Sequence, residues 1–306
     1  MPYPPQPAAA CFGAIHVDVI AHATRPARRE TSTPGVTETA PGGVATNVAR
    51  TLVRLGISCA LAGALGRDAD GDRLAAELAR EGISLGAVQR RDLPTGRYLA
   101  VHDPDGSLAA AVVDARITDT LDADALALDH PEIAAAGLWF AEANLPGAVL
   151  ERIALAAGDR HLAADAVSIA KAPRLEAVLA RLDLLVLNRA EAAALTGLPE
   201  AVPLSDHGER LAQRGVRALA ISDGAAPLHW RDGTTQGSIA PRPCTIVDVT
   251  GAGDALIAGT LAALVRDRPL AQALETGLRA AECALGGSGA VPSGMTWPVV
   301  AGMDRD

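Results

Sequence analysis

The chain has 306 residues, of which 49% are hydrophobic and 21% are charged, so it can bury a large core and is not expected to be disordered. Its formal net charge is −9 and only 2% of its residues are aromatic, which argues against a nucleic-acid partner that needs basic surface and stacking rings. No run of residues is long and apolar enough to predict a membrane span, so we expect no membrane contact.

The cysteines indicate the compartment. Cys11, Cys59, Cys244 and Cys283 are scattered, without the paired spacing of a zinc site or of a disulfide framework. Free thiols of this kind are typical of a reducing environment. Because the N-terminal run also lacks the positive charges of a signal peptide, we expect a cytoplasmic location.

In the first part of the chain, a tail precedes alternating strands and helices. Residues 1–9 contain four prolines and are expected to form a flexible tail. The apolar run 10–20 predicts a buried strand, and the helical spacing of apolar residues over 43–55 predicts a helix. A short strand is expected over 57–65, and a helix over 70–80.

The pattern changes between residues 95 and 115. Two extended runs, 96–102 and 108–114, flank the segment 103–106, which reads Asp-Pro-Asp-Gly and is typical of a turn. These runs predict an antiparallel hairpin inserted into an otherwise alternating chain.

Alternation of strands and helices resumes after the hairpin. Strands are expected at 138–141, 161–166, 184–187 and 218–222, a second hairpin near 228–239, and helices at 148–157, 175–181, 191–195, 209–214, 252–265 and 270–285. Such alternation is typical of a mostly parallel sheet with helices on both faces. The sequence therefore predicts one α/β domain over residues 10–306 with a small β appendage.

The richest motif reads Asp-Val-Thr-Gly-Ala-Gly-Asp at 248–254, directly before a helical pattern. Glycines at a helix start expose backbone N–H groups to an anion, and Asp254 is placed to take a proton from an attacking hydroxyl. The alternative is a plain glycine turn with Asp254 as a helix cap. A Walker A loop is excluded because the only lysine is Lys171, and Leu256 departs from the dinucleotide fingerprint.

A second group of polar and glycine residues surrounds the first predicted helix. Gly42 and Gly43 precede this helix and allow a close backbone approach, while Asn47 lies in its first turn. Asp18 lies near the end of the first predicted strand, where open sheets place ligand groups. Structural glycines and a turn-forming Asp18 are the alternatives.

Asn188 and Glu191 form a third candidate, after the predicted strand 184–187. Residues three apart at a helix start share one side, which suits a hydrated Mg²⁺ held against phosphates. A capping asparagine with a surface glutamate is the alternative interpretation.

Taken in this order and spacing, the motifs resemble those of the ribokinase-like (PfkB) carbohydrate kinase family over residues 10–297. The resemblance implies an α/β sandwich with a mostly parallel central sheet covered by helices, and a small β-sheet lid built from about 21–40 and 95–117. It further implies ATP-dependent phosphorylation of a sugar or nucleoside hydroxyl, with Mg²⁺ and K⁺, by a homodimer formed through the lid.

The resemblance also implies roles for individual residues. Asp254 would be the general base, and the amides of Gly251, Ala252 and Gly253 would form the anion hole. Sugar contacts are implied for Asp18, Gly42, Gly43 and Asn47. ATP contacts are implied for Asn188, Ser222, Gly224, Thr250 and Gly289, Mg²⁺ contacts for Asn188 and Glu191, and K⁺ contacts for Asp248, Thr250 and Ser293.

Within the family, the details resemble the pseudouridine kinases. The run 165–171, which ends in Lys171, together with Asn144 and Asp114, is similar to their nucleoside-binding segments. Lys171 also stands out by itself, because the other 26 of the 27 basic residues are arginines.

The sequence departs from the pseudouridine kinase pattern at a few positions, namely His16, Ala45, Thr46, Glu142 and Ala166. A ribokinase, an adenosine kinase or another nucleoside kinase therefore stays an alternative. A non-catalytic nucleoside sensor on the same fold and, more distantly, a Rossmann dehydrogenase are alternatives from other classes.

Overall fold

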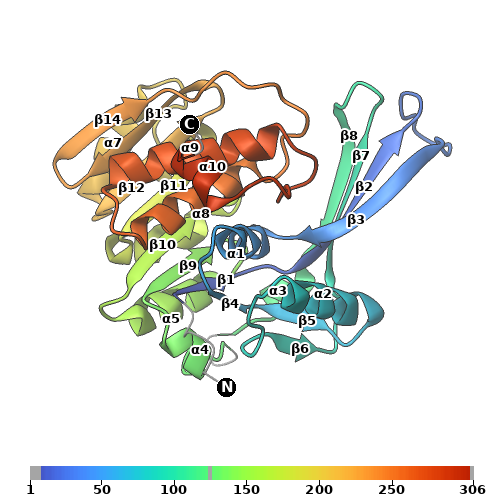
Figure 1. Ribbon diagram of the computed structural model, residues 1–306, viewed down its shortest axis with the longest axis horizontal. Coiled ribbons are helices and arrows are strands. Elements are labelled where there is room, and N and C mark those ends of the chain that lie inside the picture. Colours follow the sequence, from blue (N-terminus) through green and yellow to red (C-terminus); the bar gives the residue numbers. More distant parts are fainter. Residues whose placement is uncertain (1–7, 123–125, 304–306) are drawn as a thin grey trace.

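The computed structural model describes residues 8–122 and 126–303 (Figure 1). Its centre is an eight-stranded sheet in the order β14-β13-β12-β11-β10-β9-β1-β4, parallel from β4 to β12 and antiparallel at β13 and β14. The strands are β1 (Ala9–Phe12), β4 (Cys59–Ala62), β9 (Leu138–Glu142), β10 (His161–Asp165), β11 (Leu184–Asn188), β12 (Ala218–Asp223), β13 (Ala226–Asp232) and β14 (Thr235–Ile239).

Helices cover both faces of this sheet because successive side chains of its strands point to opposite sides. Trp139 and Leu185 enter the cluster under one set of helices, while their neighbours Phe140 and Val186 enter the other cluster. The first set is α5 (Gly147–Ala157), the 3₁₀ helix η1 (Ala172–Arg181), α6 (Arg189–Thr196) and α7 (Leu204–Gln213). The second is α1 (Val44–Arg54), α8 (Ala252–Leu264), α9 (Leu270–Leu285) and α10 (Trp297–Ala301).

A separate four-stranded sheet, here called the small sheet, projects from the body (Figure 1). Its order is β3 (Gly35–Gly42), β2 (His16–Ala23), β7 (Gly96–His102) and β8 (Leu108–Asp114). Four further elements lie near its base (Figure 1), namely β5 (Ala64–Gly66), α2 (Ala69–Arg80), β6 (Gln89–Arg91) and α3 (Arg116–Asp119), whereas α4 (Pro131–Ala134) contacts β1.

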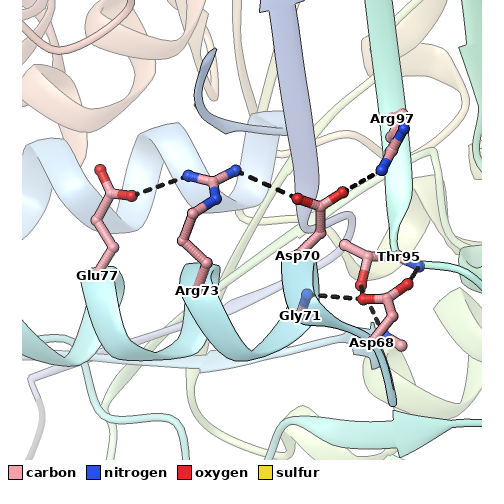
Figure 2. Close-up of polar contacts among 8 residues, drawn as sticks. Asp68, Asp70, Gly71, Arg73, Glu77, Thr95 and Arg97 are labelled. Atoms are coloured by element: carbon pink, nitrogen blue, oxygen red, sulfur yellow. Dashed lines mark hydrogen bonds and ion pairs between the residues drawn. The ribbon is translucent and has the colours of Figure 1, made fainter.

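The start of α2 anchors the base of the small sheet (Figure 2). Asp68 caps this helix by accepting from Gly71 N (2.8 Å), and it also accepts from the backbone N (2.8 Å) and Oγ1 (2.6 Å) of Thr95. Asp70 forms an ion pair with Arg97 on β7. The backbone at the start of β7 is thus held by partly buried hydrogen bonds to Asp68 and by an exposed ion pair of Arg97.

The predicted architecture is confirmed: a mostly parallel sheet lies between helices, and a separate small sheet is present. The run 10–20, predicted as one strand, is instead β1 and β2, which belong to different sheets. The break falls after Phe12, where Gly13 N still bonds Ala62 O but Ala14 N donates to the buried Glu142 (2.6 Å). The buried carboxylate of Glu142 thus replaces a neighbouring strand as the acceptor for one backbone N–H group, and the chain leaves the central sheet and enters the small sheet.

Two other predicted elements also differ from the observed ones. The predicted strand 57–65 is β4 and β5 in two sheets, and the predicted helix 175–181 is the longer 3₁₀ helix η1. Of the predicted tail, residues 1–7 lie outside the described residues, and Ala9 already begins β1. Within the described part of the chain, no helix has the length and hydropathy that crossing a bilayer requires.

Candidate active site

The site lies where the amino ends of α1 and α8 meet. These two helices pack side by side, so Asn47 and Asp254, which are 207 positions apart, come into contact. Asn47 Nδ2 donates to Asp254 Oδ2 at 2.8 Å. The side chain of Asn47 is only 4% exposed, and its Oδ1 has no partner among the described residues. The Asn47 amide therefore holds the Asp254 carboxylate through its nitrogen, and its oxygen is available to accept a hydrogen bond from another group.

Two glycines are required by this geometry. Gly251 precedes α8 with φ +76°, and a Cβ there would lie 2.6 Å from the Cα of Ala290. Gly42 ends β3, and a Cβ there would lie 2.0 Å from the Cγ of Asp18. Glycine at these positions lets the loop near Ala290 approach the start of α8, and lets Asp18 lie over the chain that leads into Gly43 and α1.

Asp18 and Asp254 are neighbouring carboxyl groups, and the charge of Asp254 acts on Asp18. Burial raises the pKa of Asp254 to about 6, although the hydrogen bond from Asn47 opposes the shift. Burial, and secondly the charge of Asp254, raise the pKa of Asp18 to about 7, with Arg50 opposing. Both groups therefore titrate near neutral pH, as expected for carboxyl groups that exchange protons with a ligand.

Asp165 and Glu191 extend this acidic region. Burial raises the pKa of Asp165 well above its usual range, and the charges of Glu191 and Asp254 add to the effect. Asp165 Oδ1 accepts from Val167 N at 2.8 Å, and Val167 has φ +63°, a left-handed conformation that is rare for a β-branched residue. In the sequence, Asp165 is only the first residue of the run 165–171, and nothing there distinguishes it as a site residue.

Asn188 and Glu191 form a capping box at the start of α6. Asn188 Oδ1 accepts from Glu191 N, and Glu191 Oε2 accepts from Asn188 N, both at 2.9 Å. Asn188 therefore caps the helix, as the alternative interpretation of the sequence expected. Glu191, however, is only 6% exposed, so it is not the surface glutamate of that interpretation. On the neighbouring strand β12, Ser222 pairs with Asn188, and Gly224 follows with φ +57° and open space at its Cβ position.

The segment before α8 is tied to the late loop through Asp248. Its Oδ1 accepts from Thr250 N (2.8 Å) and its Oδ2 from Gly289 N (3.2 Å). Burial alone would raise the pKa of Asp248, but these bonds outweigh it and lower the pKa. The carbonyl of Ser293, farther along the late loop, accepts from Nη1 of Arg54 on α1 (3.2 Å).

Asp114, Asn144 and Lys171 line one cavity of about 420 Å³. Lys171 Nζ donates to Asn144 Oδ1, and burial lowers the lysine pKa. Hydrogen bonds from Arg116 hold the pKa of Asp114 at about 2, so this group is charged at neutral pH. The other lining residues are Val113, Ala115, Arg116, Asp119 and Arg174.

Glu142 connects the cavity to the break between β1 and β2. It is fully buried and accepts from Ala14 N (2.6 Å) and from Asn144 N (2.7 Å). Burial raises its pKa to about 7. The sequence showed Glu142 only as a departure from a motif, and its role in holding Asn144 follows from contacts between distant segments.

The structure thus brings the predicted residues together in four places, one of which is the capping box of Asn188 and Glu191 beside Ser222. Asp18, Asn47 and Asp254 share the first, and Asp114, Asn144 and Lys171 share the second. The third joins Asp248 to the loop of Gly289. In the described ranges 8–122 and 126–303, no three histidine, cysteine or acidic residues are arranged to hold a metal ion by themselves.

Comparison with known proteins places the chain among kinases. The model of the pfkB family carbohydrate kinases matches residues 6–297. Pseudouridine kinase of Escherichia coli (strain K12) is 28% identical over 269 residues, which are 86% of this chain and 85% of that protein. A carbohydrate kinase from Agrobacterium tumefaciens is 29% identical, with a TM-score of 0.83 and 96% of each chain covered.

The fold is also that of ribokinases. Arabidopsis thaliana ribokinase complexed with ribose and ATP has a TM-score of 0.86 at 21% identity, and the match covers 98% of this chain and 100% of that one. At this identity, the likeness shows a common fold.

Proposed function

The chain belongs to the pfkB family of carbohydrate kinases, and from this premise we propose that it phosphorylates the 5′-hydroxyl of a ribose, with pseudouridine as the preferred substrate. As a member of this family it is a sugar or nucleoside kinase, a phosphotransferase with a hydroxyl acceptor. The observation that carries the proposal is the contact between Asn47 and Asp254 at the amino end of α8, next to Asp18.

Asp254 is proposed as the general base. The substrate hydroxyl would donate its proton to this carboxylate while its oxygen attacks the terminal phosphorus of ATP. Asn47 holds the carboxylate in place, and its unpartnered Oδ1 is available to a sugar hydroxyl. Asp18, with the backbone of Gly42 and of the following Gly43, would bind the remaining sugar hydroxyls, because Asp18 adjoins Asp254 and Gly42 lies directly against the Asp18 carboxylate.

The ATP phosphates are proposed to lie at the start of α8. The first amides of a helix have no partner within the helix, so Gly251, Ala252 and Gly253 offer N–H groups to the charge that develops on the transferred phosphoryl group. The rest of the nucleotide would extend past Ser222, Gly224, Thr250 and Gly289.

The residues present fit a hydrated Mg²⁺. The charges of Glu191 and Asp254 add to the raised pKa of Asp165, so a cation near these groups would relieve repulsion, and Asn188 fixes the Glu191 carboxylate. Mg²⁺ usually keeps several waters and is held by one or two carboxylates together with phosphates, which agrees with the lack of a complete three-residue site in the described chain. When bound, the ion would neutralise phosphate charge.

Asp248 and Thr250 are proposed to border a K⁺ site, because the Asp248 carboxylate joins the anion-hole segment to the late loop. Ser293 is the third residue proposed for this site, and its carbonyl accepts from the guanidinium of Arg54. A cation beside Asp248 would keep the Gly251–Gly253 amides in the orientation that the transition state requires.

The cavity of Asp114, Asn144 and Lys171 is proposed to take the base. Its charged and amide groups suit the carbonyl and N–H groups of a pyrimidine, and its lining includes the segments that resemble pseudouridine kinases. Pseudouridine has one ring N–H that uridine lacks, so a site that bonds this group leaves an acceptor unpaired with uridine.

A substrate panel tests the proposal. We expect kcat/KM for pseudouridine to exceed that for uridine, adenosine and ribose by roughly 5- to 150-fold, the effect of one unpaired buried group. Release of ADP measures the rate. Lys171→Arg should lower this preference, because a planar fork cannot replace the ammonium that donates to Asn144. Arg217→Lys, in an exposed ion pair with Asp183, is the matched control.

The other outcomes of the panel are equally informative. A tenfold advantage of ribose or adenosine would leave the kinase assignment in place and contradict the pseudouridine assignment. If the protein binds a nucleoside or sugar but transfers no phosphoryl group to any of them, the result would favour a non-catalytic nucleoside sensor.

The pH profile follows from the two raised pKa values. Asp254 must be ionised to accept a proton, and its pKa is about 6, while that of Asp18 is about 7. We expect kcat/KM to fall as the pH is lowered through this range, by about tenfold per pH unit at the acid end. Initial rates from pH 5 to 9 at constant ionic strength test this, and a flat profile between pH 5 and 8 would contradict the base assignment.

The small sheet is proposed to act as a lid over the sugar and as the dimer contact. Asp18 and Gly42 belong to its strands β2 and β3, which supports the lid. On the opposite face of this sheet, Val19, Leu99 and Val112 lie side by side, and the last two are 46% and 68% exposed. Exposed apolar neighbours of this kind are typical of a surface that another chain covers.

A further inference from the structure

His16 has a buried imidazole whose Nε2 has no hydrogen-bond partner among the described residues. The residue is 5% exposed. Buried polar atoms normally form hydrogen bonds, so a buried nitrogen without a partner is unusual. His207 and His229 also have a buried Nε2 without a partner in the described chain, but they lie on α7 and β13. What distinguishes His16 is its position beside the active site.

The neighbouring strands of the small sheet leave room for the imidazole ring of His16. His16 begins β2 and pairs with Gly42 on one side and Gly96 on the other. A Cβ at position 96 would lie 2.5 Å from His16 Cδ2 and 3.2 Å from Nε2, so only glycine leaves room for the ring over β7. Thr95, the residue before Gly96, is fixed by two hydrogen bonds to Asp68 (Figure 2).

The neighbours of His16 show which parts of the site it adjoins, because the Cβ position of Gly96 that meets the ring also lies 3.4 Å from the backbone oxygen of Asp114, a residue that lines the proposed base cavity. Burial and the positive charge of Lys171 lower the pKa of His16 to about 4, while Asp114 acts in the opposite direction. The ring is therefore neutral at pH 7. Lys171 and Asp114 line the proposed base cavity, whereas Asp18, two residues along β2 and on the same face of the sheet, adjoins Asp254.

We propose that His16 Nε2 forms a hydrogen bond with the polar edge of a nucleobase and thereby makes the enzyme select nucleosides over free sugars. The inference rests on the proposed function. A neutral imidazole can donate or accept at Nε2 according to its tautomer, so it suits a carbonyl or a ring N–H group. A free pentose held at Asp18 and Asp254 leaves Nε2 buried without a partner, which lowers its relative affinity.

Three substitutions at this position test the proposal. His16→Leu has a similar size and no polar atom, and we expect it to raise KM for the nucleoside by about 10-fold or more, with little change in kcat. Its kcat/KM for ribose should stay within about threefold. His16→Gln, whose amide nitrogen reaches the position of Nε2, should restore most of the selectivity, and the shorter His16→Asn should not. His229→Leu is the matched control, since it removes another buried histidine with an unpartnered Nε2.

The measurements are kcat and KM for pseudouridine and ribose, with calorimetric titration of pseudouridine as a second readout. If His16→Leu unfolds, the two polar variants decide, because only Gln reaches far enough. Equal losses on nucleoside and ribose, or wild-type selectivity in His16→Asn, would overturn the His16 assignment and leave the kinase assignment intact. Wild-type enzyme that phosphorylates only free sugars would overturn both.

Discussion

Asp254→Asn is expected to lower kcat by about 10²–10⁴-fold, the usual contribution of a general base. Asparagine keeps the shape of the side chain and can still contact Asn47, but it cannot take the proton from the substrate hydroxyl. The KM for the sugar and the affinity for ATP should change little, because the charge is needed only when the proton moves. Single-turnover rates at saturating substrate measure this effect.

A stability measurement separates loss of the base from loss of the fold. Burial raises the pKa of Asp254 from 3.8 to about 6, so its proton is bound more tightly in the folded state, and folding stability decreases as the pH rises through this interval. Asparagine has no such charge, so Asp254→Asn should have an equal or higher Tm at pH 7. Asp232→Asn, exposed on β13, is the matched control. Activity of Asp254→Asn within a few-fold of wild type would refute the base assignment.

Gly251→Ala is expected to lower kcat by about 10²–10³-fold, the cost of losing a donor to the developing charge. Gly251 has φ +76°, and an added Cβ would lie 2.6 Å from the Cα and 2.7 Å from the carbonyl oxygen of Ala290. These are backbone atoms, so the start of α8 must shift and its amides with it.

The matched control for this change is Gly294→Ala, in the same late region of the chain. Gly294 has an ordinary φ and no atom within 4 Å of its Cβ position, so alanine there should leave the rate unchanged. Gly251→Ala with wild-type kcat would show that the amides at this turn do not serve the phosphoryl group. A lower Tm with unchanged kcat would lead to the same conclusion.

Local patterns in the sequence determined most of the helices and strands. The apolar spacing over 252–265 corresponds to α8 (Ala252–Leu264), and the turn at 103–106 joins β7 and β8 over the residues predicted. The order of the glycine motifs also indicated the family before any contact was known, because the glycines and the carboxylates of the segment 248–254 are contiguous in the chain. These features depend on neighbours in sequence, which periodicity and motif spacing report.

Contacts between distant segments were decided only by the tertiary structure. The apolar run 10–20 shows that its side chains are buried, but not that β1 and β2 belong to different sheets, which depends on the backbone partner offered by Glu142. Nor does the sequence reveal that Asn47 holds Asp254, or that Gly96 makes room for His16. A pattern along the chain records which face is buried, whereas the packing of α1, α8 and the small sheet determines which buried groups meet.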